Sequence, residues 1–150
     1  METNNFQRIG SISNAHVGNE FEEIVLKFFA DQGLSLARGF SVPVGAGAVK
    51  KPRNFDFGSE QPAILVECKS HAWTSGGNAP SAKLTVWNEA MYYFLIAPSK
   101  YRKILFALKS VRRDTSLAAY YVRCYGHLIP EKVEIWEYDV ETNKAAHINP

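Results

Sequence analysis

The stretch AILVECK, residues 63–69, is an apolar run that ends in two charged residues two positions apart. Successive side chains of a β-strand point to opposite faces of the sheet, so Glu67 and Lys69 share one face while Cys68 lies on the other. A carboxylate and an ammonium group therefore meet on one face at the end of the strand. The stretch predicts a strand with a polar site at its carboxyl end.

A second acid precedes this strand. Residues 54–58, NFDFG, read as a short strand that carries Asp56 between two aromatic residues, and residues 59–62, SEQP, have the composition of a turn. A hairpin formed by the two strands brings Asp56 beside Glu67 and Lys69. Carboxylate oxygens are the ligands that magnesium prefers, and an ammonium group is a compact partner for phosphate. The hairpin therefore predicts a site for a divalent cation and a phosphate.

The rest of the chain alternates between helical and strand patterns. Residues 17–32 carry apolar side chains at helical spacing, and Gly33 ends that helix. A second helix follows, with Ser81 as its predicted N-cap and Pro98 beyond its end. The remaining predictions are a strand at 36–44, a strand at 104–108, a helix at 117–125 that Gly126 ends, and a strand at 133–138. The order is αβββαβαβ, which predicts an α/β fold with a central mixed sheet flanked by helices.

The length and composition favour a single domain. A chain of 150 residues with 46% hydrophobic content can bury one core and leaves little for a second. We therefore expect one domain over residues 1–150, with mobile arms at 1–15 and 143–150.

The sequence also predicts a cytoplasmic protein. Its longest apolar stretches, residues 24–30 and 90–97, are too short to span a bilayer, and the start METNN lacks a signal peptide's basic and apolar regions. Cys68 and Cys124 lie far apart without a CxxC pair, so we expect both to be reduced.

Basic residues cluster near the predicted site although the net charge is only +2. Such clusters beside carboxylates can hold a polyanion while the acids hold a metal ion, although solvated loops that keep the protein soluble have the same composition. Trp73 lies in a glycine-rich loop, residues 73–80, where it can contact a base. The candidate nucleic-acid contacts are Lys50, Lys51, Arg53, Trp73 and Lys83.

These residues and the element order resemble the PD-(D/E)xK nuclease superfamily, whose restriction-endonuclease-like fold has an αβββαβ core. Asp56 matches the first acid of the signature, Glu67 the second and Lys69 the lysine, while Phe55 stands where the superfamily name has proline. The resemblance covers residues 18–108.

The first helix is most similar to that of the archaeal-type Holliday junction resolvases, in which a glutamate four residues after a glycine joins the metal site. Gly18 and Glu22 stand in that relation here, and Glu20 is the alternative. On a helical wheel Glu22 falls at the border of the apolar face, while Glu20 lies on the opposite flank.

The resemblance implies a magnesium-dependent DNA endonuclease. Asp56, Glu67 and the backbone carbonyl of Cys68 would hold one or two magnesium ions, with manganese able to substitute, and Glu22 would complete the shell directly or through water. Lys69 would orient or deprotonate the attacking water. A chain this short would engage duplex or junction DNA as a symmetric homodimer.

Two alternatives remain open at this point. A compact restriction or homing endonuclease would read a sequence through the loops at 44–53 and 73–80. A non-catalytic nucleic-acid-binding accessory subunit would keep the fold without cleavage. Two further aromatic residues are better explained without catalysis: Trp87 has core spacing, and His71 follows Lys69 by two positions without a required role.

Overall fold

A computed structural model describes the backbone of residues 2–150 and the side chains from Val17 onward. Six strands form one mixed sheet in the order β1-β2-β3-β4-β7-β8, and a two-stranded ribbon pairs β5 with β6. The elements are α1 (Glu2–Asp31), β1 (Ala37–Val44), β2 (Lys51–Glu60), β3 (Ala63–Lys69), α2 (Ser81–Ile96), β4 (Arg102–Leu108), β5 (Val111–Arg112), β6 (Thr115–Ser116), α3 (Leu117–Tyr125), a 3-10 turn (Gly126–Leu128), β7 (Val133–Asp139) and β8 (Lys144–His147).

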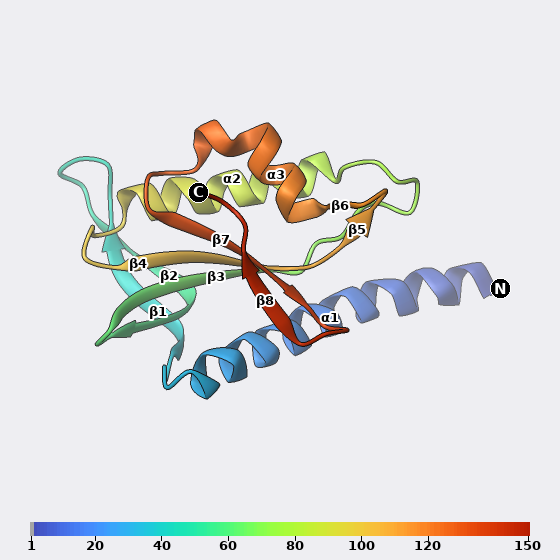
Figure 1. Cartoon of the computed structure of the whole chain (residues 1–150), viewed down its shortest axis with the longest axis horizontal. Helices are drawn as coiled ribbons and strands as arrows, with labels where there is room; N and C mark the ends of the chain where they lie inside the picture. The colour runs from blue at the N-terminus through green and yellow to red at the C-terminus, as the bar shows by residue number, and fades with distance from the viewer. Residues whose placement is uncertain (1) are drawn as a thin grey trace.

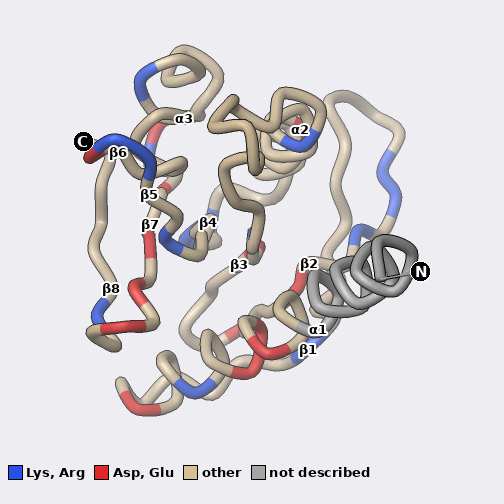
Figure 2. Tube along the Cα trace, turned by 90° about the vertical axis from the view of Figure 1, so that its right-hand side faces the viewer, with Lys and Arg blue, Asp and Glu red and all other residues tan. Residues whose placement is uncertain are grey.

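The helices cover both faces of the sheet. Figure 1 shows α1 below the sheet and α2 with α3 above it, and the turned view of Figure 2 shows the same three layers. Strands β1, β2 and β3 are antiparallel neighbours, whereas β3, β4 and β7 run parallel. The predicted α/β class, the αβββαβ order and the central mixed sheet flanked by helices are confirmed.

The helix α1 packs through an apolar stripe that its sequence spacing predicts. Phe21, Val25 and Phe29 recur every four residues and are all buried against the sheet. At the end of the helix, Gly33 N–H donates to Ala30 O and Leu34 N–H donates to Phe29 O, while Gly33 adopts a left-handed φ of 82°. This is the Schellman pattern, and it confirms Gly33 as the helix stop. The predicted arm at residues 1–15 lies outside the part of the chain whose side chains are described.

The helix α2 covers the other face through Leu84, Trp87, Met91 and Phe94, which are all buried. Burying each large apolar side chain of this kind contributes roughly 1.5–3 kcal/mol. The prediction that Ser81 caps this helix is wrong, because the N-cap residue is Pro80 and no side chain caps the first turn. Ser81 is instead the first helical residue.

The predicted C-terminal arm, residues 143–150, is also corrected. Residues Lys144–His147 form the edge strand β8, which pairs antiparallel with β7. Beyond that strand, the Asn149 side chain accepts a hydrogen bond from Ile135 N–H at 2.7 Å and donates to Val133 O at 2.8 Å. An amide side chain that completes the backbone pairing of β7 attaches the terminus to the sheet. In the described part of the chain, no helix is both long and apolar enough to cross a membrane.

Candidate active site

The candidate site lies where two neighbouring strands part. Pairing between β2 and β3 runs from Glu60↔Ala63 to Phe57↔Val66 and stops there. From that point the first half of β2 pairs with β1 alone, while β3 continues along β4 as far as Lys69↔Ala107. We call the opening between the two diverging strands the fork. Asp56 and Glu67 are the first residues beyond the last pair.

The backbone of β2 changes face at Asp56. Phe55 packs in the core under α2, whereas Phe57 packs in the core under α1, although residues two apart in a regular strand share a face. On the neighbouring strand, Gly39 has a left-handed φ of 57° and interrupts the ladder opposite Asp56. The distortion turns the Asp56 side chain toward β3.

The Asp56 side chain replaces a backbone hydrogen bond that is missing between β2 and β3. Its Oδ2 accepts a hydrogen bond from Cys68 N–H at 2.8 Å, so a backbone donor that β2 no longer reaches is satisfied by a side chain of β2. This bond holds the Asp56 carboxylate at the mouth of the fork.

A pocket of about 430 Å³ occupies this opening, and we call it the carboxylate pocket. It brings together the four residues that the sequence predicts as catalytic, from three elements: Glu22 from α1, Asp56 from β2, and Glu67 and Lys69 from β3. Cys68, whose backbone carbonyl is a predicted ligand, also lines it.

Glu67 is the most buried acid of the pocket, with 4% of its surface exposed. Burial, followed by the charge and the hydrogen bond of the neighbouring Asp56 carboxyl, raises the pKa of Glu67 to about 8. Lys69 and Arg53 oppose that rise, but their effect is smaller. The two carboxyl groups therefore share a site in which ionising both is costly.

Glu22 approaches the same pocket from the helix side. Burial and then the charge of Asp56 raise the pKa of Glu22 above its ordinary value. The exposed residue Glu20, the alternative to Glu22, is not among the pocket-lining residues. A methyl group added at Gly18 would meet the Ser70 hydroxyl at 3.5 Å, an ordinary contact, so α1 passes close to the end of β3 here.

Arg53 also lines the carboxylate pocket and places a guanidinium beside the acids. Its Nη2 lies 3.5 Å from Glu67 Oε1, at the limit of a hydrogen bond, and the guanidinium stacks over the Tyr93 ring at 4.0 Å. Its Nε is buried without a hydrogen-bond partner. A buried donor of this kind is available to a ligand oxygen.

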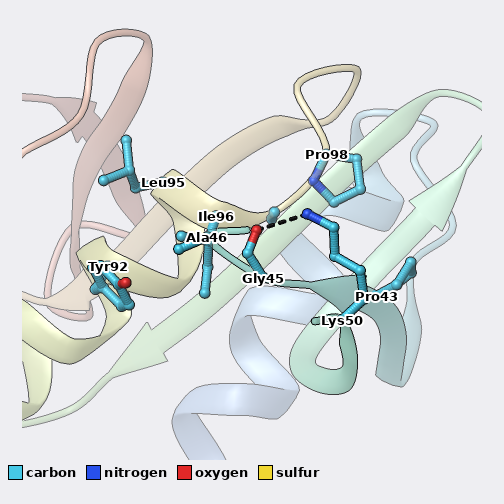
Figure 3. A pocket seen from close by; sticks show the side chains of 9 residues that line it. Pro43, Gly45, Ala46, Lys50, Tyr92, Leu95, Ile96 and Pro98 are labelled. Carbon is cyan, nitrogen blue, oxygen red and sulfur yellow. Dashed lines mark hydrogen bonds between the residues drawn. The ribbon is translucent and has the colours of Figure 1, made fainter. Parts of the chain in front are cut away.

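The other predicted nucleic-acid contacts lie outside this pocket. Lys50 donates to Gly45 O at 2.8 Å and lines an open, mainly apolar pocket of about 610 Å³ between the β1–β2 loop and the end of α2 (Figure 3). Lys51 is exposed where β2 begins. Trp73 and Lys83 line a third pocket, together with His71.

The loop that carries Trp73 is anchored to the fold. Trp73 Nε1–H donates to Ser110 O at 3.0 Å, its backbone N–H donates to Ser110 Oγ at 3.2 Å, and the Arg112 guanidinium stacks over its ring at 4.5 Å. Trp73 is therefore held in place and half-buried, and it does not lie at the tip of a free loop.

His71 has a partner that the sequence does not reveal. Its Nδ1 accepts a hydrogen bond of 2.8 Å from Nε1–H of Trp87, a residue of α2 that is almost completely buried. The core position predicted for Trp87 is confirmed, and the same side chain orients His71. Sixteen residues separate the pair, so no local pattern could have indicated it.

Asp56 and Glu67 are the paired acids of the carboxylate pocket, and Glu22 lines it from α1. Within residues 17–150, no group of three or more His, Cys, Asp or Glu side chains is placed to hold a metal ion. Magnesium is commonly held by one or two carboxylates plus water and substrate phosphate, and a desolvated carboxyl pair is stabilised by a hard cation. The Asp56–Glu67 pair therefore fits this ion chemically, with Glu22 in reach of the same pocket.

Comparison of the chain with family models, with curated proteins and with solved structures finds no match.

Proposed function

We propose that this protein is a magnesium-dependent endonuclease that hydrolyses phosphodiester bonds of DNA at the carboxylate pocket. The observation that carries the proposal is the convergence of Glu22, Asp56, Glu67 and Lys69, from three elements, on one pocket at the fork. The resemblance to the PD-(D/E)xK superfamily assigns roles to the same four residues.

The chain's own groups suit the charges of this reaction. A bound magnesium ion supplies positive charge against the phosphate oxygens and the leaving oxygen. Asp56 and Glu67 are the residues to hold it, and Glu22 and the backbone carbonyl of Cys68, two further lining residues, would complete its shell. The free Nε of Arg53 is a donor for a phosphate oxygen. Lys69 provides an ammonium group to orient the attacking water.

The test compares matched acids on the same helix and the same hairpin. Glu67→Ala and Asp56→Ala should abolish magnesium-dependent cleavage, because each removes a ligand that stabilises charge in the transition state. Glu22→Gln should reduce it. Glu23→Gln and Glu60→Gln, which change exposed acids outside the pocket, should cleave as the wild type does.

The substrates are plasmid, a synthetic four-way junction and a mismatched duplex, each with magnesium and with EDTA. Preference for the junction favours a resolvase-like enzyme, and cutting at one sequence favours the restriction or homing alternative. Wild-type cleavage by Asp56→Ala refutes the catalytic site, and DNA binding without any cleavage favours the accessory-subunit alternative. For the proposed homodimer, light scattering should give about twice the 16.8 kDa of the chain.

A further inference from the structure

A second pocket adjoins the carboxylate pocket. It has a volume of about 500 Å³ and lies between the segment after β3 and the first turn of α2. Ser70 and His71 line both pockets, so the two share a wall. We call this second opening the flanking pocket. Its lining also includes Trp73, Thr74 and Lys83, whose polar atoms could contact a ligand.

The two pockets differ in charge. Three carboxylates line the first, whereas none of the side chains that line the flanking pocket is acidic. Lys83, which is exposed, stands in the first turn of α2, and that turn contains no acid. The first pocket combines its acids with Arg53 and Lys69, whereas Lys83 gives the flanking pocket a positive charge without an acid beside it, so the flanking pocket attracts an anion.

His71 supplies an oriented donor at the shared wall. Because Nδ1 accepts the hydrogen bond from Trp87 Nε1–H, the proton of the neutral imidazole is on Nε2. Trp87 is held by the core and by its contact with the Tyr121 ring at 5.0 Å, which limits rotation of the imidazole. Burial first, and then the charges of Lys69 and Lys83, lower the pKa of His71, which favours the neutral ring.

We propose that the flanking pocket binds the phosphodiester next to the scissile one in the same DNA strand, with His71 Nε2–H and the Lys83 ammonium as its two donors. The inference rests on the proposed function, because it places the scissile phosphate in the carboxylate pocket. It assigns His71 a positioning role and no part in proton transfer. The segment after β3 then holds the strand on one side of the cut.

The two donors differ in charge, and this gives them separate signatures. A lysine that neutralises a phosphate releases condensed counterions, so its loss weakens binding and lowers the salt dependence by about one ion. A neutral imidazole releases none. Loss of its hydrogen bond to a charged oxygen should weaken binding roughly tenfold without changing the salt dependence.

The experiment measures binding of a fluorescein-labelled DNA substrate by anisotropy, in calcium, across a range of salt concentrations. Lys83→Gln should weaken binding and reduce the slope of log K against log salt by about one. His71→Asn keeps an acceptor for Trp87 but loses the outward donor, and should weaken binding at unchanged slope. His71→Gln, which restores an amide donor near the Nε2 position, should recover much of the affinity.

Lys27→Gln is the matched control, since Lys27 is an exposed lysine of α1 that lines a different pocket. A neutral methylphosphonate, placed in turn at each linkage near the cut, locates the contact. At one linkage, the methylphosphonate should weaken DNA binding by the wild type strongly and binding by Lys83→Gln much less.

The outcomes separate the two proposals. If the wild type binds and cuts DNA while Lys83→Gln and His71→Asn behave like Lys27→Gln, the flanking pocket is refuted and the active site stands. If the slope of log K against log salt is equal for Lys83→Gln and the wild type, the contact between Lys83 and the phosphate is likewise refuted. If the wild type neither binds nor cuts any of the DNA substrates, both proposals are refuted.

Discussion

Glu67→Gln should make the metal-free protein more stable at neutral pH while removing the proposed magnesium-dependent cleavage. Gln has nearly the shape of Glu, it carries no charge, and its amide can donate to the Asp56 carboxylate. In the wild type the buried Glu67 carboxyl has a pKa of about 8, raised by burial and by Asp56. Unfolding returns that carboxyl to water and to an ordinary pKa near 4.5.

The sign of the effect follows from proton binding. Between pH 4.5 and 8, the unfolded chain has lost the Glu67 proton while the folded chain keeps it, so the stability of the wild type falls as the pH rises. Each pH unit in this window corresponds to about 1.4 kcal/mol, which gives a penalty of about 3 kcal/mol at pH 7. Below pH 4.5 both states are protonated and the penalty disappears.

The assay is urea unfolding of both proteins in EDTA at pH 5, 6, 7 and 8. The free energy of unfolding of Glu67→Gln should exceed that of the wild type by little at pH 5 and by about 3 kcal/mol at pH 7. The latter corresponds to roughly 6–12 °C in melting temperature. Glu131→Gln, a change at an exposed acid, serves as control. If the stabilities of the wild type and Glu67→Gln change in parallel between pH 5 and 8, the argument that the fork raises the pKa of the Glu67 carboxyl is refuted.

Three further results are expected. Calcium should raise the melting temperature of the wild type by binding the native state, and Asp56→Ala should lose that response in the same differential-scanning titration. The Glu134 carboxylate pairs with Arg102, and this ion pair should contribute about 0.5–1 kcal/mol to stability at pH 7. The Arg102 hydrogen bond is the first cause that lowers the pKa of Glu134, so the stabilities of Glu134→Gln and the wild type should converge in acid unfolding as the pH falls below 4.5. Gly39→Ala should cost about 1 kcal/mol in urea unfolding because of its left-handed φ alone, whereas Gly58→Ala should cost more, since its added carbon would lie 2.3 Å from a Phe40 ring atom.

The sequence predicts those parts of the fold whose signals are local. Phe21, Val25 and Phe29 repeat at helical spacing, and they mark the buried face of α1 without any knowledge of its partner. The stretch 63–69 likewise places Glu67 and Lys69 on one face of a strand, and both line the carboxylate pocket. The hairpin predicted for residues 54–69 accounts for the position of Asp56 beside Glu67.

Features that depend on distant pairing could not be predicted. The fork exists because the β2–β3 ladder ends at Phe57↔Val66, and register is decided by packing across the whole sheet. Strict alternation would place Phe55 and Phe57 on the same face, and the turn of the backbone at Asp56 contradicts it. The strand β8 has only four residues, KAAH, without an apolar pattern of its own. It is a strand because β7 presents an open edge.

Asp56 shows why the geometry of the fork and its chemistry are linked. Its Oδ2 accepts from Cys68 N–H, and this bond holds the carboxylate at the pocket beside Glu67. A regular β2–β3 ladder would satisfy Cys68 N–H through the backbone and would leave no opening for the acids. The protein therefore gives up one backbone pairing at this point, and a side chain replaces the bond. The opening that results places two carboxyl groups in a partly desolvated site, where they destabilise the fold unless a further positive charge joins Lys69 and Arg53. A sheet that closed the fork would be more stable, and it would lack the pocket on which the proposed chemistry depends.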